Sequence, residues 1–178
     1  MLVAVALCCW TGCQAGRKAQ NLCCTMSHSG IPKDVSSVDA IVAALYETIS
    51  GPAGAERDWD RLNNLFYPGA RLLRTMVASD GSIGISAMDA QGFAEFATSY
   101  FRTNAFYERE VFRRVDGFGR MAQVFSTYEA CSAPDGTGSM GRGINSIQLW
   151  SDGRRWWVMS MLWDDERPEN AIPPQYLP

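Results

Sequence analysis

Few residues in this 178-residue chain combine a reactive type with a spacing that could support acid–base or metal chemistry. The only histidine is His28, and the thiols of Cys8-Cys9 and Cys23-Cys24 are adjacent, without the two-residue gap of a zinc knuckle. One further cysteine, Cys131, follows, so the rest of the chain cannot form an internal disulfide. We therefore predict no metal site and no resident cofactor.

The acidic residues do not form a paired acid and base either. Asp164 and Asp165 are neighbours, so on a strand their side chains point to opposite faces. We expect them to cap the strand end or to pair with Arg167. The chain also has no β-α-β alternation and no GxSxG elbow, which argues against the common dinucleotide-binding and hydrolase folds.

The composition indicates one soluble domain with a full core, because 47% of the residues are hydrophobic and 20% are charged. The net charge of -3 gives no electrostatic reason to expect nucleic acid or an acidic membrane surface as a partner.

The N-terminal segment differs from the rest. Residues 1–13 form an apolar run that is too short to span a bilayer and is about as long as the core of a signal peptide. Its Gly12-Cys13 ending resembles a bacterial lipoprotein signal, in which Cys13 is acylated and the protein is exported to the cell envelope or periplasm. The alternative is translation from Met26 and a cytoplasmic protein, and the mass of the native N-terminus would distinguish the two. We assign 1–34 to leader and linker and 35–178 to one domain.

Within this domain, helical periodicity precedes strand periodicity. Ser36-x-x-Asp39 and Ser86-x-x-Asp89 have the spacing of helix capping boxes. The expected elements are, in order, a helix over about 36–50, a helix from about 58 to 67, a strand over 70–77, a helix from about 88 to 101, and strands over 106–115, 120–131, 142–150 and 155–164. Helices followed by a run of strands predict an α+β fold, a curved antiparallel sheet closed on its concave face by about three helices.

The segment from Gly143 to Asp165 reads as two strands joined by Ser151-Asp152-Gly153, and both strands are apolar on both faces. Strands of this kind must be covered on both sides, so we place this hairpin at the centre of the sheet.

The order of elements resembles the nuclear transport factor 2-like (NTF2-like) superfamily, which includes scytalone dehydratase, ketosteroid isomerase and the SnoaL-like polyketide cyclases. The local likeness rests on VDAIVAALYETISGPAG, DWDRLNNLFYPGARLL and the segment from GINSIQLW to the C-terminus. It is similar to a bacterial branch of that superfamily and implies a cone-shaped fold. Function is not implied, because this fold hosts enzymes and binding modules alike.

The resemblance also allows known catalytic residues to be sought. A ketosteroid isomerase needs a carboxylate on the strand after the second helix, where this chain has 70–74, ARLLR, and an acid on a late strand, where it has GRGINSIQLW. Scytalone dehydratase uses histidine, which residues 35–178 lack. These differences argue against both known chemistries.

The resemblance further implies a cavity lined by the last strand. If Trp163 points inward, strict alternation places Met161, Met159 and Trp157 on the same face, a wall suited to an apolar or aromatic ligand. The alternative is that these side chains simply fill the core. The expected polar contacts are Arg74, Tyr46, Tyr128 and Asn145, and an inward Arg74 would favour a ligand with a carboxylate.

The same alternation places Trp156, Val158, Ser160 and Leu162 on the other face of the strand. A second copy of the sheet would cover this face, so we predict a homodimer. The favoured function is small-molecule binding. The alternatives are an isomerase, dehydratase or polyketide-cyclase-type enzyme, which an enclosed carboxyl with a raised pKa would favour, and a non-catalytic dimerisation module, which a filled cone would favour.

Overall fold

The structure is a computed structural model that describes residues 32–178, so residues 1–31 of the expected leader and linker, with Cys13, Met26 and His28, lie outside the described residues. The end of that segment belongs to the fold, since Asp34 is buried and pairs with Arg61. The elements run in the order η1 (Pro32–Val35), α1 (Val38–Ile49), α2 (Trp59–Leu65), β1 (Phe66–Val77), β2 (Ile83–Met88), α3 (Ala90–Phe101), β3 (Tyr107–Phe118), β4 (Met121–Cys131), β5 (Ser139–Ser151), β6 (Trp156–Asp165) and η2 (Pro174–Tyr176).

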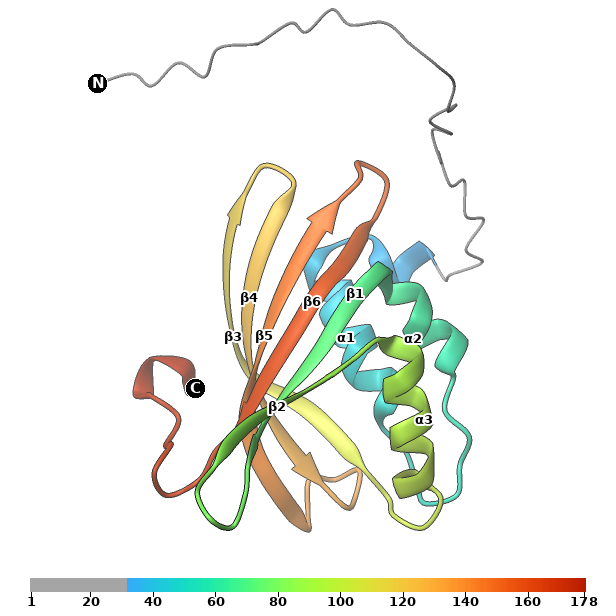
Figure 1. Ribbon diagram of the computed structural model, residues 1–178. Helices are drawn as coiled ribbons and strands as arrows, with labels where there is room; N and C mark the ends of the chain where they lie inside the picture. The colour runs from blue at the N-terminus through green and yellow to red at the C-terminus, as the bar shows by residue number, and fades with distance from the viewer. Residues whose placement is uncertain (1–31) are drawn as a thin grey trace, which may run out of the picture.

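The strands form one curved six-stranded sheet in the order β2-β1-β6-β5-β4-β3. Figure 1 shows α1, α2 and α3 together on one side of it. We call the helix side the inner face and the opposite side the outer face. The predicted α+β cone is confirmed, and the hairpin of β5 and β6 lies at the sheet centre, as expected. The sheet is open, with β2 and β3 at its edges, and it is mixed where a wholly antiparallel sheet was predicted: β1 pairs with β6 in parallel, whereas the other neighbours are antiparallel.

The sequence did not reveal β2 or the early start of β1. β2 is an edge strand whose apolar side chains face solvent, with Ile83 76% exposed, so no buried face marks it as a strand. β1 begins at Phe66, ahead of Pro68 and Gly69, because those residues lie at a register shift between Phe66 and Arg71 and do not end the strand.

The helix starts follow their capping side chains. Ser37, one residue after the expected Ser36, accepts a hydrogen bond from the amide of Ala40 and caps α1. Asp58 and Asp89 cap α2 and α3 in the same way. Each cap satisfies an amide that has no partner inside its helix.

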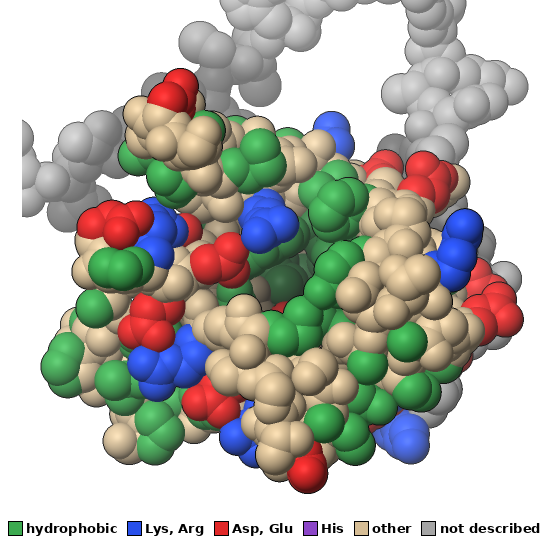
Figure 2. Space-filling view, turned by 90° about the horizontal axis from the view of Figure 1, so that it is seen from below, with side chains coloured by type: hydrophobic (Ala, Val, Ile, Leu, Met, Phe, Trp, Pro, Cys, Tyr) green, Lys and Arg blue, Asp and Glu red, His purple; other side chains and the backbone are tan. Residues whose placement is uncertain are grey.

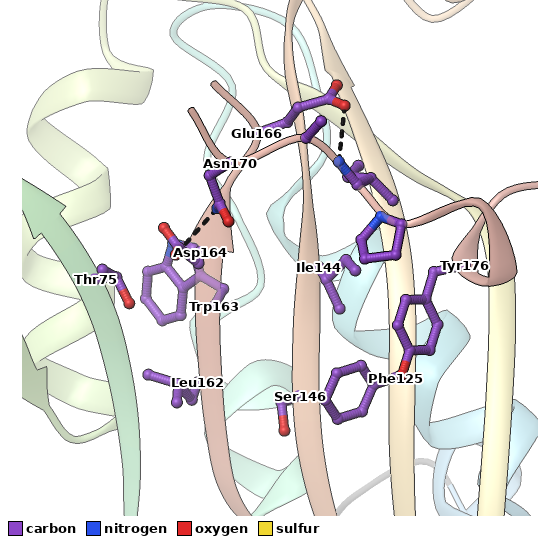
Figure 3. A pocket seen from close by; sticks show the side chains of 13 residues that line it. Thr75, Phe125, Ile144, Ser146, Leu162, Trp163, Asp164, Glu166, Asn170 and Tyr176 are labelled. Carbon is purple, nitrogen blue, oxygen red and sulfur yellow. Dashed lines mark hydrogen bonds between the residues drawn. The ribbon is translucent and has the colours of Figure 1, made fainter. Parts of the chain in front are cut away.

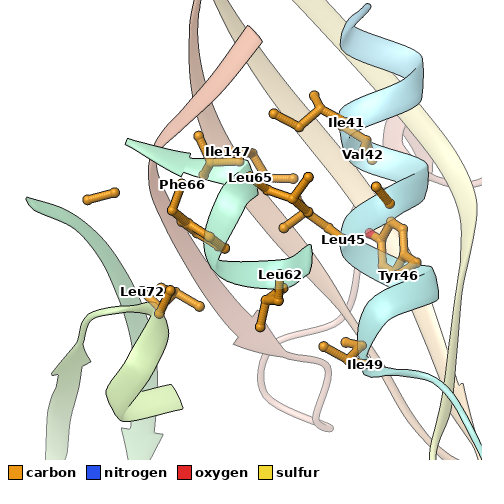
Figure 4. Packing of buried hydrophobic residues seen from close by; sticks show 14 of the residues in the cluster. Ile41, Val42, Leu45, Tyr46, Ile49, Leu62, Leu65, Phe66, Leu72 and Ile147 are labelled. Atoms are coloured by element: carbon orange, nitrogen blue, oxygen red, sulfur yellow. The ribbon is translucent and has the colours of Figure 1, made fainter. Parts of the chain in front are cut away.

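The main core lies between the first two helices and the inner face. Figure 4 shows side chains of α1, α2 and the sheet meeting there. The best-buried members come from both layers: Ile41, Val42, Leu62, Leu65, Val124, Ile147, Leu149 and Val158. Burying each of these side chains contributes about 1.5–3 kcal/mol, so this cluster supplies much of the driving force for folding.

β6 contains a β-bulge that corrects one prediction. Gln148 of β5 is opposite Ser160, but the next residue, Leu149, is opposite Val158, which leaves Met159 as an extra residue on β6. An extra residue reverses the alternation of side chains along a strand.

The predicted face of Trp157, Met159, Met161 and Trp163 is therefore wrong. Trp156 and Val158 pack in the core together with Met161 and Trp163. Trp157, next to the buried Val158, points to the outer face, where its ring lies 5.8 Å from that of Tyr67.

Arg57 organises the loop between α1 and α2. Its side chain is 6% exposed, and its guanidinium donates hydrogen bonds to the carbonyl oxygens of Ile49, Gly51, Pro52 and Ala55 over 2.7–3.2 Å. The same group lies over the ring of Phe101, 4.8 Å from its centroid. Arg57 thereby joins this loop to α3.

We predict that Arg57→Ala lowers the free energy of unfolding by about 2–4 kcal/mol, because it leaves several carbonyls without their donor. Arg57→Lys should recover little, since one ammonium cannot reproduce the planar fork. Urea denaturation measures both. Arg114→Ala, which removes an exposed ion pair with Asp116, should change stability by about 0.5 kcal/mol or less. Equal effects of the two alanine variants would contradict this role.

Candidate functional site

A cavity of about 440 Å³ lies between α3 and the inner face. Figure 2 shows this end of the molecule hollowed, with hydrophobic side chains inside the hollow and acidic and basic side chains beside it. The apolar walls come from both layers: Phe93, Phe96, Ala97, Tyr100, Phe101, Phe106, Met161 and Trp163. We call this space the cone cavity.

The third helix forms one wall and the mouth of the cone cavity. The apolar stripe of this helix consists of Phe93, Phe96, Ala97, Tyr100 and Phe101, and it is buried only in part: Phe96 is 58% exposed while Ala97 and Phe101 are buried. Phe93 meets Trp163 of β6 edge to face, at 6.4 Å between ring centroids. Only the inner part of the stripe therefore belongs to the core.

The deep end of the cone is almost filled. Beyond Phe93 and Met161 only about 20 Å³ of free space remains, lined by Leu45, Leu62, Phe66 and other core residues. The structure thus combines the two alternatives raised by the sequence, a packed deep end and an open mouth.

One polar cluster on the cavity wall is centred on Asp165, at the end of β6. The hydroxyl of Tyr128 donates to Asp165 Oδ1 at 2.6 Å, and Arg74 Nη2 donates to Asp165 Oδ2 at 3.1 Å. Burial and the hydrogen bond to Asp165 raise the pKa of Tyr128 above its ordinary value, so Tyr128 stays protonated. Since Arg74 already has an anionic partner, its position gives weak support for a carboxylate ligand.

Glu108, on β3, is the cavity residue that the sequence analysis missed. Burial raises the pKa of its carboxyl from 4.5 to about 8, and the negative charge of Asp165 adds to the increase. The opposing effect is a long hydrogen bond of 3.4 Å from Asn145 Nδ2 to Glu108 Oε1. The sequence did contain a signal for Glu108. This residue follows Phe106 by two positions, so the two side chains share one face of the strand.

Asn145 links the cavity to a buried hydrogen-bond chain behind it. Its Nδ2 also lies 3.1 Å from the hydroxyl of Tyr46, and that hydroxyl is 2.6 Å from Ser126 Oγ. Ser126 in turn donates to Glu110 Oε1. Burial and the nearby Glu108 raise the pKa of Tyr46, so this tyrosine stays protonated.

The structure brings together most of the predicted site residues. Arg74, Tyr128, Asn145, Met161 and Trp163 line the cone cavity. Tyr46 lies behind this cavity, at the deep end of the cone. Trp157 and Met159 are not among the lining residues, as the bulge requires.

The two adjacent aspartates point to opposite faces, as expected. Asp165 faces the cone cavity, whereas Asp164 accepts a hydrogen bond of 2.7 Å from Arg167.

A second hollow of about 360 Å³ lies on the outer face, between the sheet and the C-terminal segment. Figure 3 shows Leu162, Ser146 and Phe125 along one side of it and Tyr176 beside Phe125. Tyr176 stacks on Phe125 at 5.3 Å, and Thr127 Oγ1 donates to the carbonyl of Tyr176 at 2.6 Å. The C-terminal segment therefore covers part of the outer face.

Two features are absent from residues 32–178. None of the helices there is long and apolar enough to cross a membrane. No group of three His, Cys, Asp or Glu side chains there is placed to hold a metal ion.

Comparisons with known proteins give structural neighbours only. No protein family and no curated protein matches the sequence. A protein of unknown function with a cystatin-like fold from Nostoc punctiforme aligns with 10% identity and a TM-score of 0.56, over 74% of this chain and 90% of its own. A variant of Rv3472 from Mycobacterium tuberculosis, also of unknown function, aligns with 14% identity and a TM-score of 0.55, over 77% and 75%.

An NTF2-like protein of unknown function from Shewanella baltica aligns with 14% identity over 71% of this chain and 89% of its own, at a TM-score of 0.47. At such identities the neighbours bear on the fold alone. The element order and sheet topology agree with the α+β cone that the resemblance implied, and the neighbours from Nostoc punctiforme and Mycobacterium tuberculosis, with TM-scores above 0.5, share this fold.

Proposed function

We propose that this domain binds a small, largely apolar or aromatic molecule in the cone cavity. The observation that supports it is the 440 Å³ space, which is within the usual range for small-molecule sites and has aromatic walls and a few convergent polar groups. Met161 can adapt to a ligand's shape, and Trp163 offers a flat contact surface. A ligand's polar group would meet Glu108, Asn145 and Asp165.

Two of the three tryptophans of β6, Trp163 and Trp157, provide a matched test. Trp163→Ala should weaken binding of an aromatic probe such as 2-acetylnaphthalene by at least tenfold, because the variant removes a wall of the cone cavity. Trp157→Ala, on the outer face of the same strand, should leave binding within about twofold. Isothermal titration calorimetry measures both affinities. Equal losses in the two variants, or no binding to the wild type, would rule out this cavity as the site for that probe.

A second candidate is an enzyme of the isomerase, dehydratase or polyketide-cyclase type. Glu108 is the observation that favours it, since a carboxyl in an apolar cavity with a pKa of about 8 can donate and accept a proton near neutral pH. Glu108 lies on β3. This position differs from both positions at which a ketosteroid isomerase requires an acid.

The protonation of Glu108 can be tested without a substrate. In the folded state the pKa of Glu108 is raised from 4.5 to about 8. The protonated carboxyl therefore contributes stability that is fully present below pH 4.5 and is lost as the pH rises to about 8. Relative to Glu108→Gln, the wild type should therefore lose up to a few kcal/mol of unfolding free energy between pH 5 and 8. Urea denaturation across this range measures it.

The exposed Glu95→Gln variant serves as the control and should keep the wild-type slope. A wild type whose pH dependence equals that of Glu108→Gln would show that Glu108 ionises normally.

We also propose that the protein is a homodimer through the outer face. The bulge changes which residues are available there, since Trp156 and Val158 point inward. Tyr67, Met159 and Leu162 remain exposed on or beside β6. Burying such a patch against a second copy would remove apolar surface from water.

Sedimentation at micromolar concentration should show a dimer that Leu162→Arg dissociates. Ile83→Arg, at the distant edge strand β2, should remain dimeric. A monomeric wild type would refute the proposal.

Export as a lipoprotein acylated at Cys13, with a cytoplasmic protein starting at Met26 as the alternative, stays a prediction from the sequence. In the first case the lipid anchor would be the only membrane contact.

A further inference from the structure

We propose that the buried chain from Glu110 to Asn145 orients Glu108 as a hydrogen-bond donor to the ligand, so that the cone cavity prefers an apolar molecule with a neutral acceptor, such as a ketone, over a carboxylate. This inference deepens the proposed function and rests on it. It names the chemical class of the ligand and gives Tyr46, Ser126 and Asn145 a positioning role.

The donor-to-acceptor direction of this hydrogen-bond chain is set at Glu110. Arg113 donates to both oxygens of Glu110, at 2.8 Å to Oε1 from Nε and at 2.5 Å to Oε2 from Nη2, so Glu110 acts as an acceptor. Ser126 therefore gives its single hydroxyl hydrogen to Glu110. Ser126 Oγ must then accept from Tyr46, whose hydroxyl lies 2.6 Å away.

The same logic fixes the amide of Asn145. Because Tyr46 donates to Ser126, its oxygen is free to accept, and the group within reach is Asn145 Nδ2 at 3.1 Å. The second hydrogen of that nitrogen is directed to Glu108 Oε1 at 3.4 Å. A rotated amide would place the carbonyl oxygen of Asn145 against the acceptor oxygens of Tyr46 and Glu108. Asn145 is 2% exposed, so no solvent water could replace the lost hydrogen bonds.

Glu108 is thus held at one oxygen only. Oε1 accepts from Asn145, and within residues 32–178 no hydrogen bond reaches Oε2. When the carboxyl carries its proton, that proton belongs on Oε2, the oxygen that Asn145 does not contact. The group can then donate a hydrogen bond to a ligand in the cone cavity, which Glu108 lines.

The charged and titratable groups around Glu108 favour this protonated form. Asp165 on β6 repels a negative charge there, and Tyr46 on α1 and Tyr128 on β4 are neutral. Each cavity cation already has a carboxylate partner, Arg74 with Asp165 at 3.1 Å and Arg142 with Glu166 at 2.8 Å, although Arg74 Nε has no hydrogen-bond partner among residues 32–178.

A carboxylate ligand would therefore have to share a cation whose charge an acidic side chain of the protein already neutralises. A neutral acceptor would gain a hydrogen bond from Glu108 and would carry no such penalty.

Three probes of one shape separate these effects, and titration calorimetry at pH 7 gives their affinities. We expect 2-acetylnaphthalene to bind about tenfold more tightly than 2-ethylnaphthalene, which lacks an acceptor, and than 2-naphthoate, which carries a charge. The advantage of the ketone over the ethyl compound should shrink as the pH rises through about 8, because Glu108 then loses the proton that it donates.

Two pairs of variants test the mechanism. Glu108→Gln should keep the ketone preference at all pH values, because an amide N–H replaces the carboxyl proton, whereas Glu108→Ala should abolish it. Tyr46→Phe removes one hydroxyl from the chain and should reduce the preference to about threefold or less, because Asn145 is then free to turn. Tyr176→Phe, on the outer face, should retain it. Circular dichroism melts establish that each variant is folded.

Each outcome is decisive. Equal affinity for the ketone and the ethyl compound overturns the donor role of Glu108 and leaves an apolar binding cavity in place. Tightest binding of the naphthoate overturns it in favour of an anion site at Arg74 or Arg142. Unchanged preference in Tyr46→Phe removes the positioning role of the chain. If none of the three probes binds, the proposed function falls and the inference falls with it.

Discussion

The extra residue at Met159 is the constraint on which the rest of the structure depends. β6 lies at the centre of the sheet, so each of its side chains must enter the core, the cone cavity or the outer face. Uniform alternation would place Val158 on the opposite face from Met161 and Trp163. With the bulge, Trp156 and Val158 seal the deep end of the cone, while Met161, Trp163 and Asp165 continue along the same inner face toward its mouth.

The polar groups lie where this apolar packing ends. Tyr46, Ser126 and Asn145 are all buried, at a depth where an unpaired hydroxyl or amide costs about 1–3 kcal/mol. They are tolerated because each satisfies the next, and because the chain ends on the ion pair of Glu110 with Arg113. A chain of this kind has few alternative arrangements, so it holds the polar wall of the cavity rigidly.

The sequence was sufficient for most of the architecture, apart from β2 and the parallel pairing of β1 with β6, and for about half of the site. Periodicity and turn residues predicted three helices and the central hairpin, because these depend on local patterns, whereas the inward Met161 and Trp163 were implied by the family resemblance. The bulge could not be predicted, since Trp156 to Trp163 is apolar at nearly every position and no polar residue marks a change of face. Glu108 was overlooked because its raised pKa arises from burial and from the negative charge of Asp165, both of which only the tertiary fold supplies.

Two carboxyl groups in one cavity have acquired different roles because the fold gives them different partners. Asp165 ends β6 within reach of a hydroxyl and a guanidinium, Tyr128 and Arg74, and so acts as an acceptor that neutralises the arginine. Glu108 lies on β3, forms no ion pair with any residue of 32–178, and accepts a single long hydrogen bond from Asn145. Exchanging these surroundings would exchange the roles, since burial favours the neutral acid and charged donors favour the carboxylate. The chemistry of the cavity thus follows from where the strands end and which side chains their neighbours present.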